Sequence, residues 1–242
     1  MQDHYVGDIG DYGKYGLLRC VADAGLRLAV NWYRVIPTRP GKQEDGKFTT
    51  YLHNPDVYRQ YDPKLFDCLS YLVKDSRSIE AVEKSGILNA HFFTQPLTVS
   101  GREQWHKAAM KATNGADIVF LDPDNGLETA KMHQNGSAKE KHVTWQELKD
   151  YYNRGQSVIL YHHRPRPESK EVCVQRILDF QRNHLHADGV LVLGYFSFTN
   201  RYYFLFTHQT HMPTLEAVYH SVVKNWAGLC TPAGIWHVPS DP

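Results

Sequence analysis

The sequence predicts an α/β protein whose mostly parallel sheet carries helices on both faces and ends in an antiparallel hairpin. Short apolar runs alternate with amphipathic segments along most of the chain, as expected when helices connect parallel strands by right-handed crossovers. The last two apolar runs are separated only by a short polar turn, which indicates a hairpin. Because no linker interrupts this alternation, residues 1–242 are expected to form a single domain.

Strands are expected where apolar runs are bounded by polar or turn-forming residues. They cover about residues 28–33, 90–94, 117–122, 157–162, 189–196 and 201–207. Helices are expected where apolar residues recur every three or four positions. They cover about residues 11–24, 63–73, 78–85, 101–114, 144–152, 171–184 and 214–226. The order is that of a Rossmann-like sheet.

Capping signals support two of these helices. Asp62 is an N-cap residue followed by proline at the first helical position, and Thr144 with Glu147 forms a capping box. Two polar stretches, residues 37–47 and 125–142, are longer than usual connections and are expected to be loops.

The composition is that of an ordinary globular protein. Lys and Arg total 27 against 26 for Asp and Glu, so any nucleic-acid site must be a local patch. No secretory signal follows Met1, and no apolar stretch approaches the ~20 residues that span a membrane. The four cysteines form no CxxC pair, which argues against a thiolate zinc site. We therefore expect a cytoplasmic protein with reduced thiols and no membrane partner.

The clearest candidate motif follows the predicted strand that ends at Asp122. The run Asp122-Pro123-Asp124-Asn125 brings two carboxylates and an amide into a turn that proline and the following Gly126 hold in shape. Ligands of open α/β sheets bind at the carboxyl ends of strands. Asp122, Asp124 and Asn125 are therefore candidate catalytic residues; the alternative is that they only satisfy donors of the turn.

A second candidate motif is the glycine-rich segment at the start of the first helix. Glycines let a ligand approach the backbone, and a helix N-terminus offers free N–H donors. The alternative is a simple N-terminal arm in which Asp11 caps the helix. The candidate cofactor-binding residues here are Gly7, Asp8, Gly10, Asp11 and Lys14.

Two further strand ends carry polar or aromatic residues. Asn31, Trp32 and Tyr33 end the first strand and are added to the cofactor-binding candidates. The fourth strand ends in a basic run whose groups suit phosphate, a metal or a nucleobase, although a solvated basic loop would look the same. In this run His163 is a catalytic candidate, and the substrate-binding candidates are His162, Arg164 and Arg166.

The order of elements resembles the class I S-adenosylmethionine-dependent methyltransferases. Asp122-Pro123-Asp124-Asn125 is similar to the Asp-Pro-Pro-Tyr motif that holds the target amine in amino-methyltransferases. The segment from Gly7 to Tyr15 is similar to the Gly-Asn-x-Ala-Asp-x-x-Lys-His start of the large-subunit ribosomal RNA adenine-N6 methyltransferases. The family's Gly-x-Gly after the first strand is absent, and Asn125 stands where the family has its stacking aromatic.

Three functions therefore stay open. The resemblance implies a methyltransferase that uses S-adenosylmethionine and acts on nucleic acid or a related substrate. The first alternative is a metal-dependent phosphoesterase or nuclease in which Asp122 and Asp124 bind Mg²⁺. The second alternative is a non-catalytic protein that binds a nucleotide or a partner. The sequence does not indicate the oligomeric state.

Overall fold

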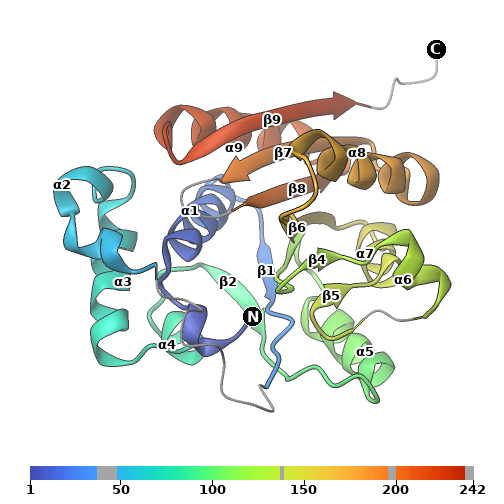
Figure 1. Cartoon of the computed structure of the whole chain (residues 1–242), viewed down its shortest axis with the longest axis horizontal. Helices are drawn as coiled ribbons and strands as arrows, with labels where there is room; N and C mark the ends of the chain where they lie inside the picture. The colour runs from blue at the N-terminus through green and yellow to red at the C-terminus, as the bar shows by residue number, and fades with distance from the viewer. Residues whose placement is uncertain (37–47, 137–138, 196–199, 238–242) are drawn as a thin grey trace.

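The computed structural model describes residues 1–36, 48–136, 139–195 and 200–237. Its main feature is a seven-stranded sheet with the order β2-β1-β3-β6-β8-β7-β9 (Figure 1). The strands of this sheet are β1 (Leu28–Asn31), β2 (Ala90–Phe93), β3 (Ile118–Leu121), β6 (Ser157–His163), β7 (Gly189–Tyr195), β8 (Arg201–Thr207) and β9 (Cys230–His237). Strands β1, β2, β3 and β6 are mutually parallel, β7 runs in the same direction, and β8 and β9 run against them.

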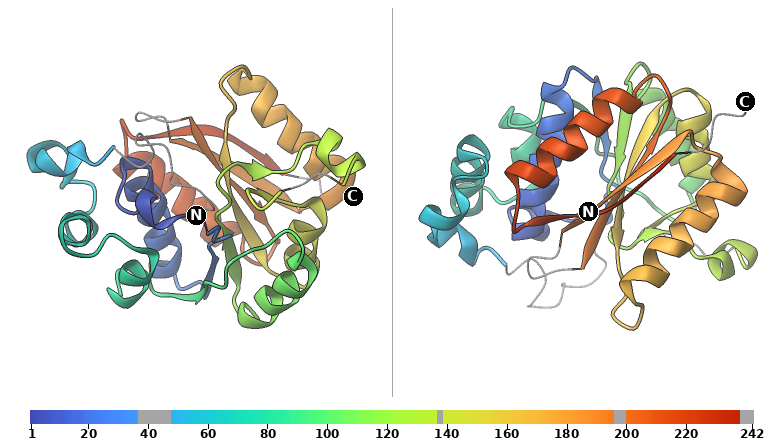
Figure 2. Two further views of the ribbon diagram at one scale, coloured as in Figure 1. Left: turned by 60° about the horizontal axis from the view of Figure 1, so that its bottom comes forward. Right: turned by 90° about the horizontal axis from the view of Figure 1, so that it is seen from above.

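The helices lie on both faces of the sheet (Figure 2). On one face the apolar side chains of β1 and β3 pack against α1 (Ile9–Asp23), α3 (Pro63–Asp75), α4 (Ile79–Lys84) and α9 (Met212–Asn225). The opposite face packs against α5 (Arg102–Ala112), α7 (Trp145–Asn153) and α8 (Lys170–Phe180). The alternation follows the strand period of two, since Leu28 and Val30 belong to the first core and Ala29 to the second.

The remaining described elements are short. They are the 3₁₀ segments η1 (Asp3–Tyr5) and η2 (Thr50–His53), helices α2 (Pro55–Tyr58) and α6 (Ala130–Gln134), the π-helical segment η3 (Gln181–Leu185), and strands β4 (Gly126–Leu127) and β5 (His142–Val143). Among the helices of the described residues, none is long and apolar enough to cross a membrane.

The expected fold class is confirmed, and so are the caps. Asp62 accepts from the Leu65 N–H, and Thr144 and Glu147 form the capping box. Asp8 rather than Asp11 caps α1, because its carboxylate accepts from the Asp11 N–H.

Two expectations were wrong in part. The polar stretch 125–142 is not one loop, since β4 and β5 pair at its two ends and enclose α6. Strand β9 was not expected, because Cys230–His237 contains a proline and lacks a clear alternation; three of its positions are exposed. The predicted loop 37–47, and most of the turn between β7 and β8, lie outside the described residues.

Candidate functional site

A polar cavity of about 400 Å³ lies at the edge of the sheet where the parallel strands end. The N-terminal turns of α1, the loop after β3, the end of β6 and the start of β8 surround it. Eight of the sequence-predicted candidates line it: Asp8, Asp11, Lys14, Asp122, Asp124, Asn125, His163 and Arg166. Segments up to 193 positions apart in the sequence therefore meet at one place.

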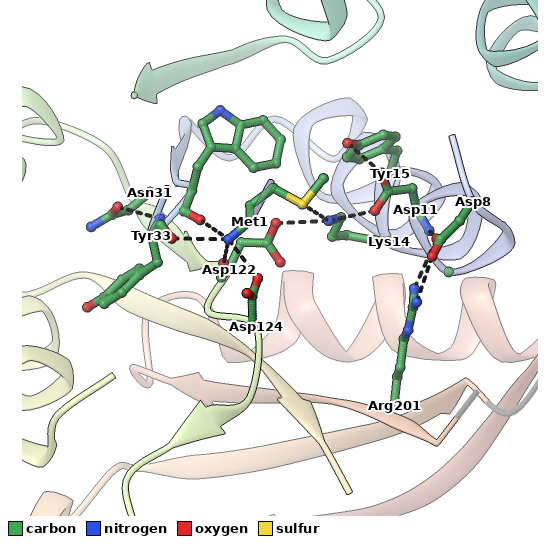
Figure 3. A network of polar contacts seen from close by, with 12 residues as sticks. Met1, Asp8, Asp11, Lys14, Tyr15, Asn31, Tyr33, Asp122, Asp124 and Arg201 are labelled. Atoms are coloured by element: carbon green, nitrogen blue, oxygen red, sulfur yellow. Dashed lines mark hydrogen bonds and ion pairs between the residues drawn. The ribbon is translucent and has the colours of Figure 1, made fainter. Parts of the chain in front are cut away.

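The centre of the cavity wall is a chain of buried ion pairs (Figure 3). Lys14 Nζ lies 2.8 Å from an oxygen of Asp11 and 2.8 Å from Oδ2 of Asp122. Burial acts to lower the pKa of Lys14, but the two carboxylates outweigh it and the net shift is upward, so Lys14 stays protonated. Burial raises the pKa of Asp11 to about 6 against the opposing effect of Lys14. The arrangement holds one cation between two carboxylates.

Asp8 forms the second charged pair of the wall. Its carboxylate accepts from the Asp11 N–H at 2.8 Å and from both terminal nitrogens of Arg201, at 2.9 and 3.3 Å. Burial acts to raise the pKa of Asp8, but Arg201 and the cap hydrogen bond outweigh it, so the pKa lies below its usual value. The Nε of Arg201 is buried and has no hydrogen-bond partner among the described residues.

Asp124 lies at the other end of the cavity and is surrounded by cations. One of its oxygens is 3.0 Å from the Met1 amino group, and the other accepts from Gln2 and lies 3.5 Å from Lys141 Nζ. Burial acts to raise the pKa of Asp124, but the Met1 ammonium outweighs it and the net shift is downward. Asp122 and Asp124 thus face different cations.

The two glycines predicted to bind a cofactor, Gly7 and Gly10, lie against side chains of the protein itself. A Cβ atom at Gly10 would lie 1.0 Å from Nη1 of Arg201, and one at Gly7 would lie 2.3 Å from a methyl carbon of Val73. Gly7 also has a positive φ of 75°, which favours glycine. Neither residue lines the cavity, and at both positions the absence of a side chain allows close packing.

The side chains of Asn31, Trp32 and Tyr33 also do not line the cavity. Asn31 donates to the Tyr151 hydroxyl at 3.0 Å, and the Tyr33 hydroxyl donates to Glu147 at 3.1 Å. The Trp32 ring is fully buried. The contribution of this loop to the cavity edge is the main-chain carbonyls of Trp32 and Tyr33, which accept from the Met1 amino group (Figure 3).

The basic run at the end of β6 divides between the two faces of the sheet. His163 lines the cavity and Arg166 is exposed at its rim. His162 faces away, accepts from the Leu127 N–H through Nδ1, and has a pKa that burial holds well below its usual value. Arg164 donates to the Asn200 side chain and to the Glu168 carbonyl. His162 and Arg164 thus have partners within the fold, and neither lines the cavity.

Several cavity residues were missed by sequence reasoning. They are Met1, Tyr5, Phe48, Lys141, Tyr161, Asn200 and Arg201. Arg201 could have been found, because an antiparallel strand begins at the edge where its parallel neighbour ends. Over the described parts of the chain, no group of three or more His, Cys, Asp or Glu side chains is placed to hold a metal ion.

Comparisons with known proteins bear on the fold. No family model matches the sequence, and no curated protein matches it. The chain is similar to the crystal structure of protein LPL1258 from Legionella pneumophila str. Philadelphia 1, which is described by the family model DUF519. The TM-score is 0.50 at 11% identity, over 97% of this chain and 98% of that one. At this identity the similarity concerns the fold alone.

Proposed function

We propose that the cavity is the active site of an S-adenosylmethionine-dependent methyltransferase that acts on nucleic acid or a related substrate in the cytoplasm. The observation that carries the proposal is the 2.8 Å ion pair between Lys14 and Asp122. It joins the two motifs that separately resemble the family, although they are 108 positions apart. If either motif resembled the family only by chance, there would be no reason for the two to meet in one buried contact.

The sheet supports the same reading at the level of the fold. Strand β8 lies antiparallel between β6 and β7, which are parallel to one another. The resembled fold class likewise ends in an antiparallel hairpin; in this chain a further strand, β9, pairs with the outer edge of β7. Fold alone does not fix function, so the weight stays on the residues of the cavity.

Asp122 is suited to hold an acceptor amine. Its Oδ2 accepts from Lys14, while Oδ1 makes no hydrogen bond within the described residues and belongs to a cavity-lining side chain. An amine N–H donating to Oδ1 would be fixed in direction, and Lys14 keeps a positive charge beside the carboxylate. Asn125, also in the wall, offers both a donor and an acceptor to a base edge.

The hydrogen-bond acceptors at this end of the cavity fit the amino end of the proposed cofactor. Main-chain carbonyls of Trp32, Tyr33 and Asp122 and the Asp124 carboxylate surround the Met1 amino group. When bound, S-adenosylmethionine supplies an electrophilic methyl group. The residues of this chain would hold its amino end through oxygens, which requires no Gly-x-Gly after β1.

The rim supplies groups for a substrate phosphate. His163, Arg166 and Arg201 line the cavity, and the exposed Arg166 is the one placed to reach a phosphate, because Asp8 holds both terminal nitrogens of Arg201. Arginine recognises phosphate through its planar fork of N–H groups. No observation among the described residues favours the Mg²⁺ alternative, because the carboxylates of Asp122 and Asp124 both face cations.

Calorimetric titration with S-adenosylmethionine, followed by transfer of a labelled methyl group to RNA and DNA, tests the proposal. Asp122→Asn should lower turnover by about 10²- to 10⁴-fold while the protein stays folded. Asp124→Asn should weaken cofactor binding more than it lowers turnover at saturating cofactor. Asp67→Asn, which changes an exposed ion pair on α3, is the matched control and should leave turnover unchanged.

Two other outcomes would favour the alternative functions. Binding without any transfer would favour the non-catalytic binding protein. Mg²⁺ binding that requires both Asp122 and Asp124, with no affinity for S-adenosylmethionine, would favour the phosphoesterase or nuclease.

A further inference from the structure

A second cavity, of about 600 Å³, lies on the face of the sheet opposite α1. It is formed between α8 and the segment that contains β4, α6 and the first residue of α7, and we call it the α8 cavity (Figure 1). It shares no lining residue with the cavity at the strand ends. Its lining follows α8 from Val172 to Phe180, which spans about 12 Å of helix. A cavity of this size can hold a small organic molecule.

The inner wall of the α8 cavity is apolar and aromatic. Leu127, Ile177 and Phe180 are buried, and the Trp145 ring lies 5.3 Å from that of Phe180 between centroids. At the rim the Val172 side chain is 56% exposed. An apolar or aromatic ligand would remove these surfaces from water, which stabilises its binding.

The charged groups of the α8 cavity are mostly acidic. Glu128, Glu171 and Asp179 line it, and among the described residues Arg176 is the one Lys or Arg that does so. The Arg176 guanidinium already donates to both oxygens of the Glu168 carboxylate, at 3.1 Å each. Because the whole chain has a formal net charge of only +1, this excess of negative charge is local. It favours a cationic ligand over an anionic one.

Glu128 is the carboxylate best placed to bind a cation in this cavity. Its side chain is only 3% exposed. Its Oε1 accepts from the Trp145 main-chain N–H at 2.7 Å and lies 3.1 Å from Nδ1 of His133. Its Oε2 makes no hydrogen bond within the described residues, so it is left to accept from a ligand. Charge-assisted hydrogen bonds between an ammonium group and a carboxylate are among the strong ones.

The far end of the α8 cavity is formed by η3. Asn183 and His184 line the cavity from this π-helical segment, and π-helical segments recur at functional sites. The His184 ring lies 4.4 Å from that of Trp145 between centroids. The aromatic wall and Glu128 are therefore at the same end of the cavity, since Glu128 accepts from Trp145.

We propose that the α8 cavity binds an organic cation, an ammonium group carried on an apolar or aromatic body. The ammonium group donates to Glu128, and the body packs against Trp145, Phe180 and Val172. The site is separate from the cavity at the strand ends and does not depend on the proposed methyltransferase function.

Three probes that differ in charge test the proposal. 4-Phenylbutylamine is a cation at pH 7, 4-phenylbutan-1-ol is neutral and 4-phenylbutyrate is an anion. For a probe of this size we expect the amine to bind with a dissociation constant of about 1–5 mM. The alcohol should bind at least ~10-fold more weakly, and the anion more weakly still, because neither replaces the charge-assisted hydrogen bond. The shift of the Trp145 indole N–H signal in NMR titrations measures all three.

Substitutions locate the bound amine. Glu128→Gln should lower the affinity for the amine by about 10-fold and leave the affinity for the alcohol unchanged. Val172→Trp, at the exposed rim, should block the cavity and abolish binding of both probes without disturbing the fold. The matched controls are Glu103→Gln and Val99→Trp, at exposed positions that do not line the cavity, and both should leave binding unchanged.

Equal affinities for the amine and the alcohol, or no binding of the amine, would overturn the proposal. Unchanged affinity for the amine in Val172→Trp would do the same, and this result holds even if Glu128→Gln fails to fold. If Glu128→Gln folds and binds the amine as tightly as the wild type, the ammonium group does not lie at Glu128 and the proposed site is wrong.

Discussion

The loops after β1 and β3 are adjacent and have different roles. Both follow fully buried strands, and Asn31 pairs in register with Leu121. After β1, the Asn31 and Tyr33 side chains bond to α7 residues inside the fold. After β3, the carboxylates of Asp122 and Asp124 line the cavity. Position at the carboxyl end of a strand therefore does not by itself make a residue part of the site.

The strand period of two explains the difference. Val30 and Phe120 face α1, whereas Ala29 and Val119 face α5 and α7. By alternation Asp122 continues the face of Phe120 and meets Lys14 of α1, while Tyr33 continues the face of Ala29. The same rule separates His163 from His162 on β6. The side that bears α1 is the side that bears the cavity.

The largest expected effect is on the cavity side. Lys14→Met leaves Asp11 and Asp122 buried without their shared cation, and we expect a loss of about 3–5 kcal/mol in unfolding free energy at pH 7. The loss should shrink toward pH 5, because a protonated Asp11 no longer needs the cation. Urea unfolding at pH 7 and pH 5 measures the loss of unfolding free energy. A loss of equal size at both pH values would contradict the proposed role of Asp11 ionisation.

A smaller effect is expected on the opposite face. Glu147 accepts from Arg102 at 2.6 and 2.8 Å and from Tyr33, and Glu147→Gln should cost about 2–3 kcal/mol. Methyl transfer by the folded fraction should be unchanged, because Glu147 lies away from the cavity. The control is Glu103→Gln, an exposed residue on α5, which should cost less than ~0.5 kcal/mol. A selective loss of activity in Glu147→Gln would show that the loop after β1 belongs to the site.

A finer difference between the ion pairs of Lys14 and the contacts of Glu147 comes from the titration of Asp11. Its pKa is raised from 3.8 to about 6, so the folded state binds more protons than the unfolded state between these values. Stability from this residue is therefore greatest at low pH and is lost as the pH rises through that window. Relative to Asp11→Asn, the wild type should lose stability from about pH 4 to about pH 6 and then level off. Chemical unfolding across this range is the measurement, and a difference that grows with pH would reverse the sign.

The sequence predicts the fold better than the site because the two depend on different information. Apolar periodicity and caps such as Thr144 are local and hold irrespective of what packs on them. The pairing of Lys14 with Asp122 depends on which face α1 covers, and no local pattern states that. Strand alternation would have separated Asp122 from Tyr33 once the face of α1 was known. The surroundings of the Met1 amino group are largely main-chain carbonyls, and no residue pattern in the sequence predicts where these point.

The smallest expected effect concerns the rim and bears on the proposed substrate. Arg166 is exposed beside His163, so it can contact a phosphate without being needed for folding. Arg166→Ala should weaken binding of an oligonucleotide by about 1 kcal/mol or less and lower the slope of log affinity against log salt by about 1, while stability stays unchanged. Arg182→Ala, at an exposed position in η3 after α8, is the matched control, because η3 follows the helix on the face opposite α1. If nucleic acid approaches from the α1 side, only the first substitution alters the salt dependence measured by fluorescence titration. Equal effects of the two substitutions would mean that the oligonucleotide binds the α1 side no more than the opposite face.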